Sequence, residues 1–358
     1  MLIEQTDFGV TRSGGHAHLF SIQNGSGMRA VLTDYGAILV SLFVPGPDGI
    51  TRDVVLGYNT LPEYEAGGFF GATVGRHANR ISGAAFTLDG VEYRLADNDN
   101  GCNLHSDFKT GFHKQLWNTE LLPDGIRFFR TSPNGEAGFP GNLDISVIYT
   151  LDEANGLHIR YEGVSDRKTL INLTNHSFFN LSGHDAGSIL DHRVTLDCDS
   201  FLEISAGRLP TGRILPVDGT AMDFLSGRRI GDTIDTDWDQ LRFAAGYDHC
   251  FVTGAEAGRL KKIALVEDPH TGCRMEVSTD LSGVQFYSAN FLPSQAGKGG
   301  AHYGPRCALC LETEYFPDSI HFPDFPQCVF DAGEIYQAET VYRFLSPDSA
   351  ARNSAYGD

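Results

Sequence analysis

The 358-residue chain has no apolar run of about 18 residues, the length that a membrane-spanning helix needs. It is also short of basic side chains, since 27 Lys and Arg stand against 46 Asp and Glu, which gives a formal net charge of −19. An acidic surface repels phosphate backbones and anionic membranes. We therefore expect neither nucleic acid nor a membrane as a partner.

Signals for export and for nucleotide binding are also missing. Residues 1–10 carry acidic and polar side chains where a signal peptide has a basic start and an apolar core, so export by that route is not expected. Neither G-x-G-x-x-G nor G-x-x-x-x-G-K-[ST] occurs, and predicted strands do not alternate with helices. The sequence thus gives no indication of a nucleotide site.

The cysteines do not form a disulfide pattern. There are seven of them, an odd number, at irregular spacings in a long chain. This favours buried, reduced thiols over a disulfide framework, and it predicts a reducing cytoplasm as the location.

What the sequence does contain is a succession of short β-type segments separated by turns. Glycine makes up 41 of the 358 residues and is spread along the chain, where it separates the segments. Convincing helices are scarce, and no repeat or composition step marks a boundary, so we predict one β-sandwich domain over residues 1–358. Pro123-Asp124-Gly125 predicts a hairpin between 116–122 and 126–131. The other expected strands are 17–22, 37–44, 52–58, 145–151, 157–164, 193–197, 262–267, 273–279, 284–288, 307–312 and 339–344.

Two polar runs within this pattern carry candidate acid and base groups. The first is Cys310-Leu-Glu-Thr-Glu-Tyr-Phe-Pro-Asp318, and the second is Asn172-Leu-Thr-Asn-His-Ser-Phe-Phe-Asn180. Side chains alternate between the two faces of a strand, so Glu312 and Glu314 share a face with Cys310, and His176 shares one with Phe178. Each run therefore presents its titratable group on a defined face.

Metal binding is a weaker interpretation of the polar residues. Cys307-x-x-Cys310 lacks a second pair to complete four ligands, and we expect both to be core cysteines. Cys102, His105 and His113 match no standard metal spacing, and the residues between them predict an irregular loop. We expect no metal.

Seven short motifs resemble, in order, those of the aldose 1-epimerase (galactose mutarotase) family, and the resemblance as a whole extends from about residue 5 to residue 345. They are Gly75-Arg-His-Ala-Asn-Arg-Ile81, Asn103-Leu-His105, Gly138-Phe-Pro-Gly-Asn-Leu143, the run 172–180, Tyr247-Asp-His249, Gly283-Val-Gln-Phe-Tyr287, and Leu311-Glu-Thr313 followed by Pro317-Asp318.

The resemblance implies a large antiparallel β-sandwich with few short helices and a shallow cleft that binds a free aldohexose. It also implies interconversion of the α and β anomers without a cofactor, with Glu312 as the base and His176 as the acid. Ring opening needs such a pair, because a proton leaves the hydroxyl on C1 while another is supplied to the ring oxygen. Histidine suits the acid role because its unperturbed pKa lies near neutrality.

The same resemblance implies the residues that hold the sugar. Sugar hydroxyls both donate and accept hydrogen bonds, so a mixed set of donors and acceptors is expected. The implied set is Asn79, Arg80, His105, Asp248 and Gln285. Phe178, Phe286 and Trp117 are candidates for an aromatic sugar platform, although core packing is the default interpretation for all three.

Simpler interpretations remain open for several of these residues. His176 alone would be read as a structural histidine, Arg80 as a partner of surface acids, Asp248 as a turn cap, and Asn79 as a loop-shaping residue. Glu314 departs from the family pattern, which has an amide there, and it is an alternative base. Two carboxylates on one face repel, which raises the proton affinity of one of them.

Two other functions also remain open. A glycoside hydrolase would use two carboxylates, for which Glu312 and Asp248 are available. A non-catalytic sugar-binding protein would need no acid and base pair. The sequence does not determine the preferred aldose, and it is compatible with a monomer or a homodimer.

Overall fold

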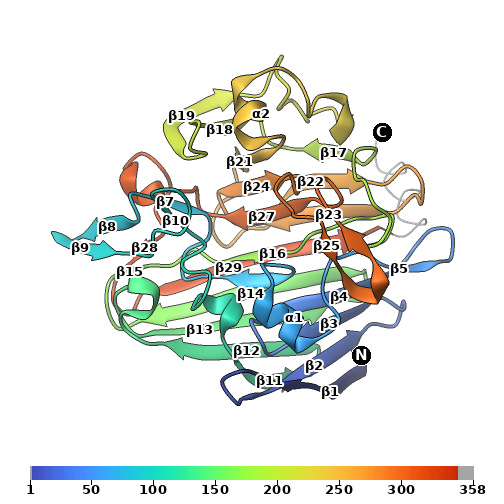
Figure 1. Ribbon diagram of the computed structural model, residues 1–358, viewed down its shortest axis with the longest axis horizontal. Helices are drawn as coiled ribbons and strands as arrows, with labels where there is room; N and C mark the ends of the chain where they lie inside the picture. The colour runs from blue at the N-terminus through green and yellow to red at the C-terminus, as the bar shows by residue number, and fades with distance from the viewer. Residues whose placement is uncertain (1, 346–358) are drawn as a thin grey trace.

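Three antiparallel sheets make up most of the structure, a computed structural model that describes residues 2–345 (Figure 1). The N-terminal sheet is a meander in the order β1 (Leu2–Val10), β2 (His16–Gln23), β3 (Arg29–Thr33), β4 (Ile38–Pro45) and β5 (Thr51–Asp53). A second five-stranded sheet has the order β19 (Pro210–Pro216), β18 (Ser200–Ile204), β21 (Asp248–Val252), β24 (Gly283–Tyr287) and β27 (Cys310–Glu314).

The largest sheet has nine strands. Its order is β11 (Asn118–Leu122), β12 (Gly125–Ser132), β13 (Leu143–Leu151), β14 (Gly156–Ser165), β29 (Ile335–Phe344), β23 (Arg274–Thr279), β22 (Lys261–Glu267), β17 (Arg193–Leu196) and β20 (Arg228–Arg229). The C-terminal strand β29 thus lies between β14 and β23, which joins two parts of the chain that are far apart in the sequence.

Short strand pairs and short helices fill the remaining connections. The pairs are β6 (Ala72–Val74) with β16 (Thr174–His176), β7 (Arg80–Ser82) with β10 (Cys102–Leu104), β8 (Ala85–Leu88) with β9 (Val91–Arg94), β15 (Thr169–Leu170) with β28 (Val329–Phe330), and β25 (Gln295–Ala296) with β26 (His302–Tyr303). The helices are α1 (Leu61–Ala66) and α2 (Asp239–Ala244), with 3-10 turns at Phe112–Lys114, Glu136–Gly138, Ile230–Asp232, Lys298–Gly300 and Ser319–His321.

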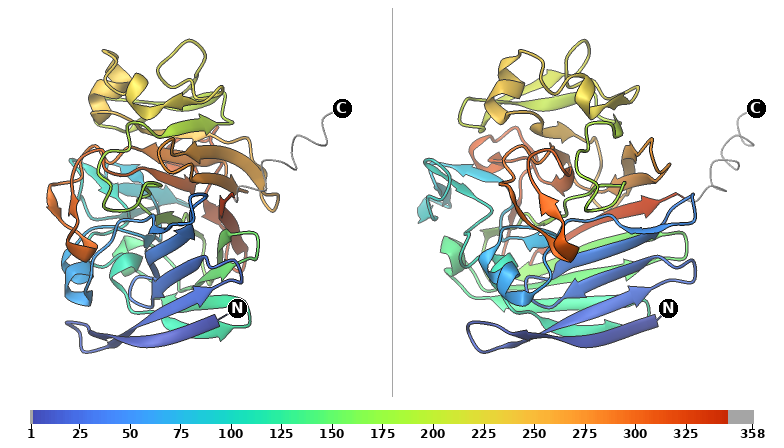
Figure 2. Two further views of the ribbon diagram at one scale, coloured as in Figure 1. Left: turned by 90° about the vertical axis from the view of Figure 1, so that its right-hand side faces the viewer. Right: turned by 45° about the vertical axis from the view of Figure 1, so that its right-hand side comes forward.

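The nine-stranded sheet packs against both five-stranded sheets, and the main core lies between them (Figure 2). Phe20 of β2 contacts Phe128 of β12 with ring centroids 5.8 Å apart. On the other side, the hydroxyl of Tyr342 in β29 donates to the carbonyl of Leu311 in β27 at 2.8 Å. The predicted β-sandwich is therefore confirmed. The predicted domain span of 1–358 includes residue 1 and residues 346–358, which lie outside the described residues.

The predicted strands agree with the structure in most places, including the hairpin of β11 and β12, in which Leu122 pairs with Gly125. The prediction for 52–58 is wrong beyond Asp53. There the amide of Val54 donates to Leu42 in the N-terminal sheet, whereas the amide of Leu56 donates to Phe178. The segment therefore leaves the N-terminal sheet and contacts the segment around Phe178, so it does not form one continuous ladder of β-sheet hydrogen bonds. The strand predicted at 307–312 begins only at Cys310.

All seven cysteines are buried and free, as the sequence predicts. Cys307 and Cys310 both belong to a hydrophobic cluster beside the N-terminal sheet. Among residues 2–345, the two α-helices are six residues long, and neither meets the length or hydropathy of a membrane span.

The first of the two arginines in the motif 75–81 is a structural residue. Arg76 is 1% exposed. Its guanidinium donates to the Ser132 hydroxyl and to the carbonyl oxygens of Ser132, Pro133, Pro140 and Gly141, at distances from 2.7 to 3.1 Å. Because Ser132, Pro140 and Gly141 are buried with the arginine, its removal leaves several buried acceptors without a donor.

We expect Arg76→Met to lower the free energy of unfolding by about 3 kcal/mol, since it unpairs buried polar groups. Urea unfolding followed by circular dichroism measures the change. The matched control is Arg94→Met, because the Arg94 side chain is 83% exposed and pairs with Glu92 on the surface. A change in Arg76→Met as small as in the control would contradict the structural role.

Candidate active site

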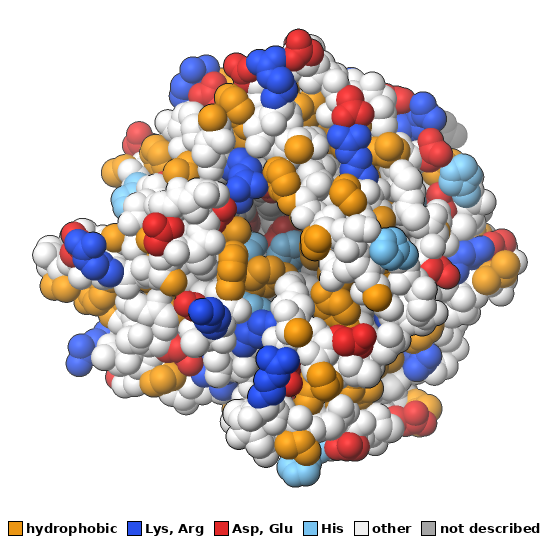
Figure 3. Space-filling model, viewed as in Figure 1, with side chains coloured by type: hydrophobic (Ala, Val, Ile, Leu, Met, Phe, Trp, Pro, Cys, Tyr) orange, Lys and Arg blue, Asp and Glu red, His pale blue; other side chains and the backbone are white. Residues whose placement is uncertain are grey.

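A cavity of about 470 Å³ opens on the face of the molecule shown in Figure 3, where histidine and hydrophobic side chains lie in a central hollow. All seven residues predicted for the site line this cavity: Asn79, Arg80, His105, His176, Asp248, Gln285 and Glu312. The structure therefore brings together residues that are up to 233 positions apart, from Asn79 to Glu312.

The register of three adjacent strands explains one wall of the cavity. Glu312 of β27 is paired directly with Gln285 of β24, and Asp248 of β21 is paired with Tyr287, two residues further along β24. Directly paired residues, and residues two apart on a strand, point to the same face of a sheet. Because side chains alternate between the two faces of β27, Leu311 points to the opposite face and lies in the main core.

The other wall carries His176, which ends β16. The backbone of Gly71 fixes this strand, because its amide donates to the His176 carbonyl at 3.0 Å and its carbonyl accepts from the Asn175 amide side chain at 3.0 Å. Gly71 has φ +66°, and a Cβ there would lie 1.9 Å from the Leu39 carbonyl oxygen. Only glycine fits this position.

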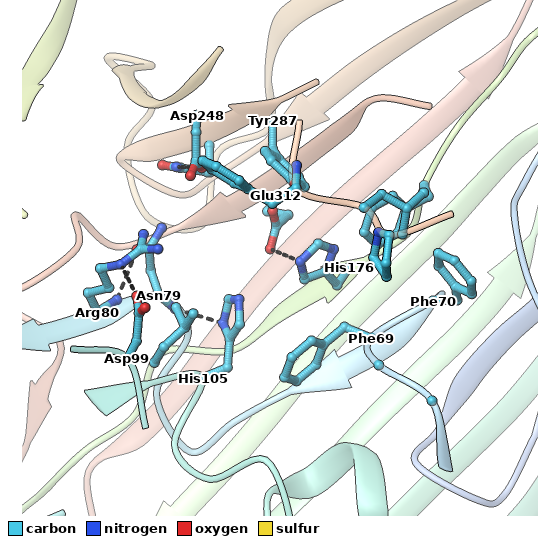
Figure 4. A pocket seen from close by; sticks show the side chains of 18 of the residues that line it. Phe69, Phe70, Asn79, Arg80, Asp99, His105, His176, Asp248, Tyr287 and Glu312 are labelled. Carbon is cyan, nitrogen blue, oxygen red and sulfur yellow. Dashed lines mark hydrogen bonds and ion pairs between the residues drawn. The ribbon is translucent and has the colours of Figure 1, made fainter. Parts of the chain in front are cut away.

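His176 and Glu312 face each other across the cavity (Figure 4). The distance from His176 Nε2 to Glu312 Oε2 is 3.6 Å, and the side chains are 8% and 5% exposed. The other ring nitrogen of His176, Nδ1, lies 3.5 Å from Cys310 Sγ. Nε2 is therefore the nitrogen available for proton exchange with Glu312 or with a bound molecule.

Burial determines the charge of this pair. It lowers the pKa of His176 to about 3, because the imidazolium is desolvated. Burial, then the carboxylates of Glu314 and Asp248, raise the pKa of Glu312 well above its usual value. Both shifts favour the uncharged forms, so a proton shared by the pair lies on Glu312 rather than on the His176 imidazole.

His105 presents a hydrogen-bond donor to the cavity. The backbone amide of Asn79 donates to His105 Nδ1 at 3.0 Å, so the neutral ring carries its proton on Nε2. Burial lowers the pKa of His105 well below its usual value, which keeps the ring neutral. The N–H of Nε2 is then free for an oxygen acceptor.

The tautomer of His105 also bears on metal binding. Ligand atoms of His105, His176 and Glu312 lie within 4.8 Å of one another, a grouping that can surround a cation. A metal-binding histidine normally donates its second N–H to a protein acceptor. The second nitrogen of His105 instead accepts a hydrogen bond from Asn79. The group therefore fits an acid, a base and a donor better than a set of metal ligands.

The remaining predicted residues supply further polar groups. Asp248 Oδ1 accepts from Gln285 Nε2 at 2.6 Å, so the two side chains act together, and Asp248 is the first residue of β21. Arg80 Nε donates to Asp99 Oδ2 at 2.8 Å, and Arg208 Nη2 contacts Asp99 Oδ1 at 3.2 Å. Arg80 therefore forms an ion pair with Asp99, which also lines the cavity, and Asp99 forms a second ion pair with Arg208.

One aromatic candidate lines the cavity and two do not. Phe178 stacks on His176 with ring centroids 4.8 Å apart and planes 8° apart. Phe286 and Trp117 are 0% and 3% exposed and belong to the main core, in line with the default interpretation.

Sequence reasoning missed several other residues of the lining, among them Phe69, Asp99, Arg208 and Tyr287. Phe69 stacks near His176, with ring centroids 5.7 Å apart and planes 12° apart. Its only sequence signal is an apolar pair after two glycines, at 67–70. Asp99 lies in the uniformly polar loop 97–101, in which no single residue stands out.

The fold and the cavity define a β-sandwich protein with a pocket that combines aromatic side chains with histidines, carboxylates and amides. The family model for aldose 1-epimerase matches residues 18–343. The galactose mutarotase of Mus musculus is 39% identical over 345 residues, which cover 96% of this chain and 98% of the mouse protein. The chain therefore belongs to the aldose 1-epimerase family.

Two further relatives support membership of the same family. The aldose 1-epimerase of Escherichia coli (strain K12) is 34% identical over 332 residues, which cover 92% of this chain and 95% of the bacterial protein. Among solved structures, the GalM/aldose epimerase homologue from C. elegans superposes with a TM-score of 0.85 at 28% identity, covering 92% of this chain and 99% of the other.

Proposed function

We propose that this protein is an aldose 1-epimerase, which interconverts the α and β anomers of free aldohexoses such as galactose and glucose. The observation that carries the proposal is the His176 and Glu312 pair, 3.6 Å apart in a cavity lined with sugar-compatible donors and acceptors. Membership of the aldose 1-epimerase family supports it.

The proposed reaction uses the one proton that the pair shares. Its transfer from Glu312 to His176 Nε2 gives a carboxylate and an imidazolium. Glu312 then accepts the proton of the C1 hydroxyl while His176 protonates the ring oxygen, so the bond between C1 and that oxygen breaks and the aldehyde forms. Rotation about C1–C2 and reversal of both transfers close the ring on the other face. The pair ends with the single proton that it had at the start.

The raised pKa of Glu312 suits this role, because a carboxylate with a higher proton affinity is a stronger base. We propose that His105, Arg80 and Asn79 bind the sugar from one side and that Asp248 and Gln285 bind it from the other. Gln285 Oε1 is buried and has no hydrogen-bond partner among the described residues. Such an acceptor is costly to leave unpaired, which suits a ligand hydroxyl.

The proposal includes no cofactor, because the two side chains supply both proton transfers. The seven buried thiols support a cytoplasmic location. We propose one domain for the chain, since the main core extends across the large sheets.

Polarimetry of freshly dissolved α-D-galactose and α-D-glucose tests the function. We expect the purified protein to accelerate the approach to anomeric equilibrium for at least one of the two sugars. Saturable sugar binding without acceleration would instead establish a binding protein. Release of reducing sugar from a disaccharide would establish a glycoside hydrolase.

A further inference from the structure

Glu314 is a buried carboxyl group that the proposed reaction does not use. It lies two residues after Glu312 on the same face of β27 and is 1% exposed. Glu312 lines the cavity, whereas Glu314 lies outside its lining. A carboxyl group is costly to bury unless a specific contact compensates for the lost water.

That contact is with Asn79. The Asn79 side-chain amide donates to Glu314 Oε1 at 2.9 Å. Asn79 also has φ +60°, a left-handed conformation that few residues other than glycine adopt readily. The contact with Glu314 helps to hold Asn79 in this conformation.

Asn79 in turn contacts two residues of the cavity. Its backbone amide donates to His105 Nδ1 at 3.0 Å, and its side-chain oxygen accepts from the backbone amide of Arg80 at 2.9 Å. A single residue, Asn79, therefore connects Glu314 to the donor tautomer of His105 and to the start of β7, which carries Arg80.

We propose that Glu314 is a positioning residue for the anomer-interconverting site: through Asn79 it orients His105 and Arg80, and it keeps the proton of His105 on the nitrogen that faces the sugar. The inference rests on the proposed function. The role requires a hydrogen-bond acceptor at this position, and it does not require a charge.

The protonation of Glu314 agrees with this role. Burial raises its pKa to about 8, with the neighbouring Asp248 adding to the shift and Asn79 opposing it. At neutral pH the group is therefore mostly uncharged. An uncharged carboxyl keeps an oxygen that accepts from Asn79, so the contact does not depend on a charge.

Three variants test the inference. Glu314→Gln keeps an acceptor for Asn79 and removes the acid, whereas Glu314→Leu removes the acceptor at similar size. Asn79→Ala breaks the same link from its other end, and it provides a second measurement if the leucine variant does not fold. Glu120→Leu, at an exposed position of the edge strand β11, is the matched control.

The first measurement is the rate of mutarotation at pH 7. We expect Glu314→Leu to lower kcat/KM about tenfold, the scale of one lost hydrogen bond in a site of this kind. Glu314→Gln and the control are expected to stay within about twofold of the unchanged protein. Equal losses in the glutamine and leucine variants would overturn the inference.

The second measurement is independent of activity. Two-bond correlation spectra of the protein labelled with ¹⁵N-histidine report which ring nitrogen of His105 carries the proton. We expect the Nε2–H tautomer in the unchanged protein and in Glu314→Gln, and a mixture in Glu314→Leu and Asn79→Ala. Unchanged His105 signals in the latter two would overturn the inference even if activity fell. If the unchanged protein showed no mutarotation, the proposed function would fail. The His105 ring-nitrogen signals would still test whether Glu314 acts on His105 through Asn79.

Discussion

Glu312→Gln is expected to lower kcat for mutarotation by about a thousandfold, within the range that a positioned general base contributes. Glutamine has nearly the same shape and still accepts a hydrogen bond, but its amide oxygen does not take up the proton of the C1 hydroxyl at neutral pH. Polarimetry of α-D-galactose at several concentrations separates kcat from KM. We expect KM to change much less than kcat, because the other polar groups of the cavity are unaltered.

The control for this variant is Glu120→Gln, which makes the same chemical change at an exposed position. It is expected to keep full activity. If Glu312→Gln retained more than about a tenth of the activity, the base would have to be another group, since losing a general base costs at least about a hundredfold. Glu314 would then be the nearest alternative on the strand.

His176→Asn is expected to lower kcat by a factor of at least about a hundred, because asparagine fills part of the same space but has no titratable nitrogen. The proton for the ring oxygen would then have to come from water. The imidazole also packs between Phe69 and Phe178, with nearly parallel rings, so the variant also loses some packing. Circular dichroism and the unfolding midpoint separate this structural loss from the catalytic one.

His16→Asn, at an exposed position at the start of β2, is the matched control and should have no effect on the rate. An active, folded His176→Asn protein would remove the acid from the proposed reaction. The reaction would then depend on Glu312 and solvent alone.

The sequence predicted the strand that carries the proposed base, together with the face of each run on which the proposed acid and base lie. Alternation along an extended strand is a local property, so Leu311 and Glu312 are assigned to opposite sides without knowledge of the fold. The hairpin of β11 and β12 was predictable for the same reason, because the turn residues between its strands favour the required bend. The seven motifs in order identified the family.

The tertiary structure decided which other residues reach the cavity. Phe69 is held beside His176 through Gly71, and Asp99 meets Arg80 and Arg208 from separate segments of the chain. No local pattern marks these residues, since their roles depend on contacts between distant segments.

Glu314 shows the difference most clearly. The sequence determined that it shares a face with Glu312, and the like charges suggested a direct electrostatic effect. Only the fold shows that Glu312 opens on the cavity while Glu314 is covered and bonded to Asn79, 235 residues away. Strand periodicity fixes the face of a side chain, but whether that face meets solvent, a cavity or another segment depends on long-range packing.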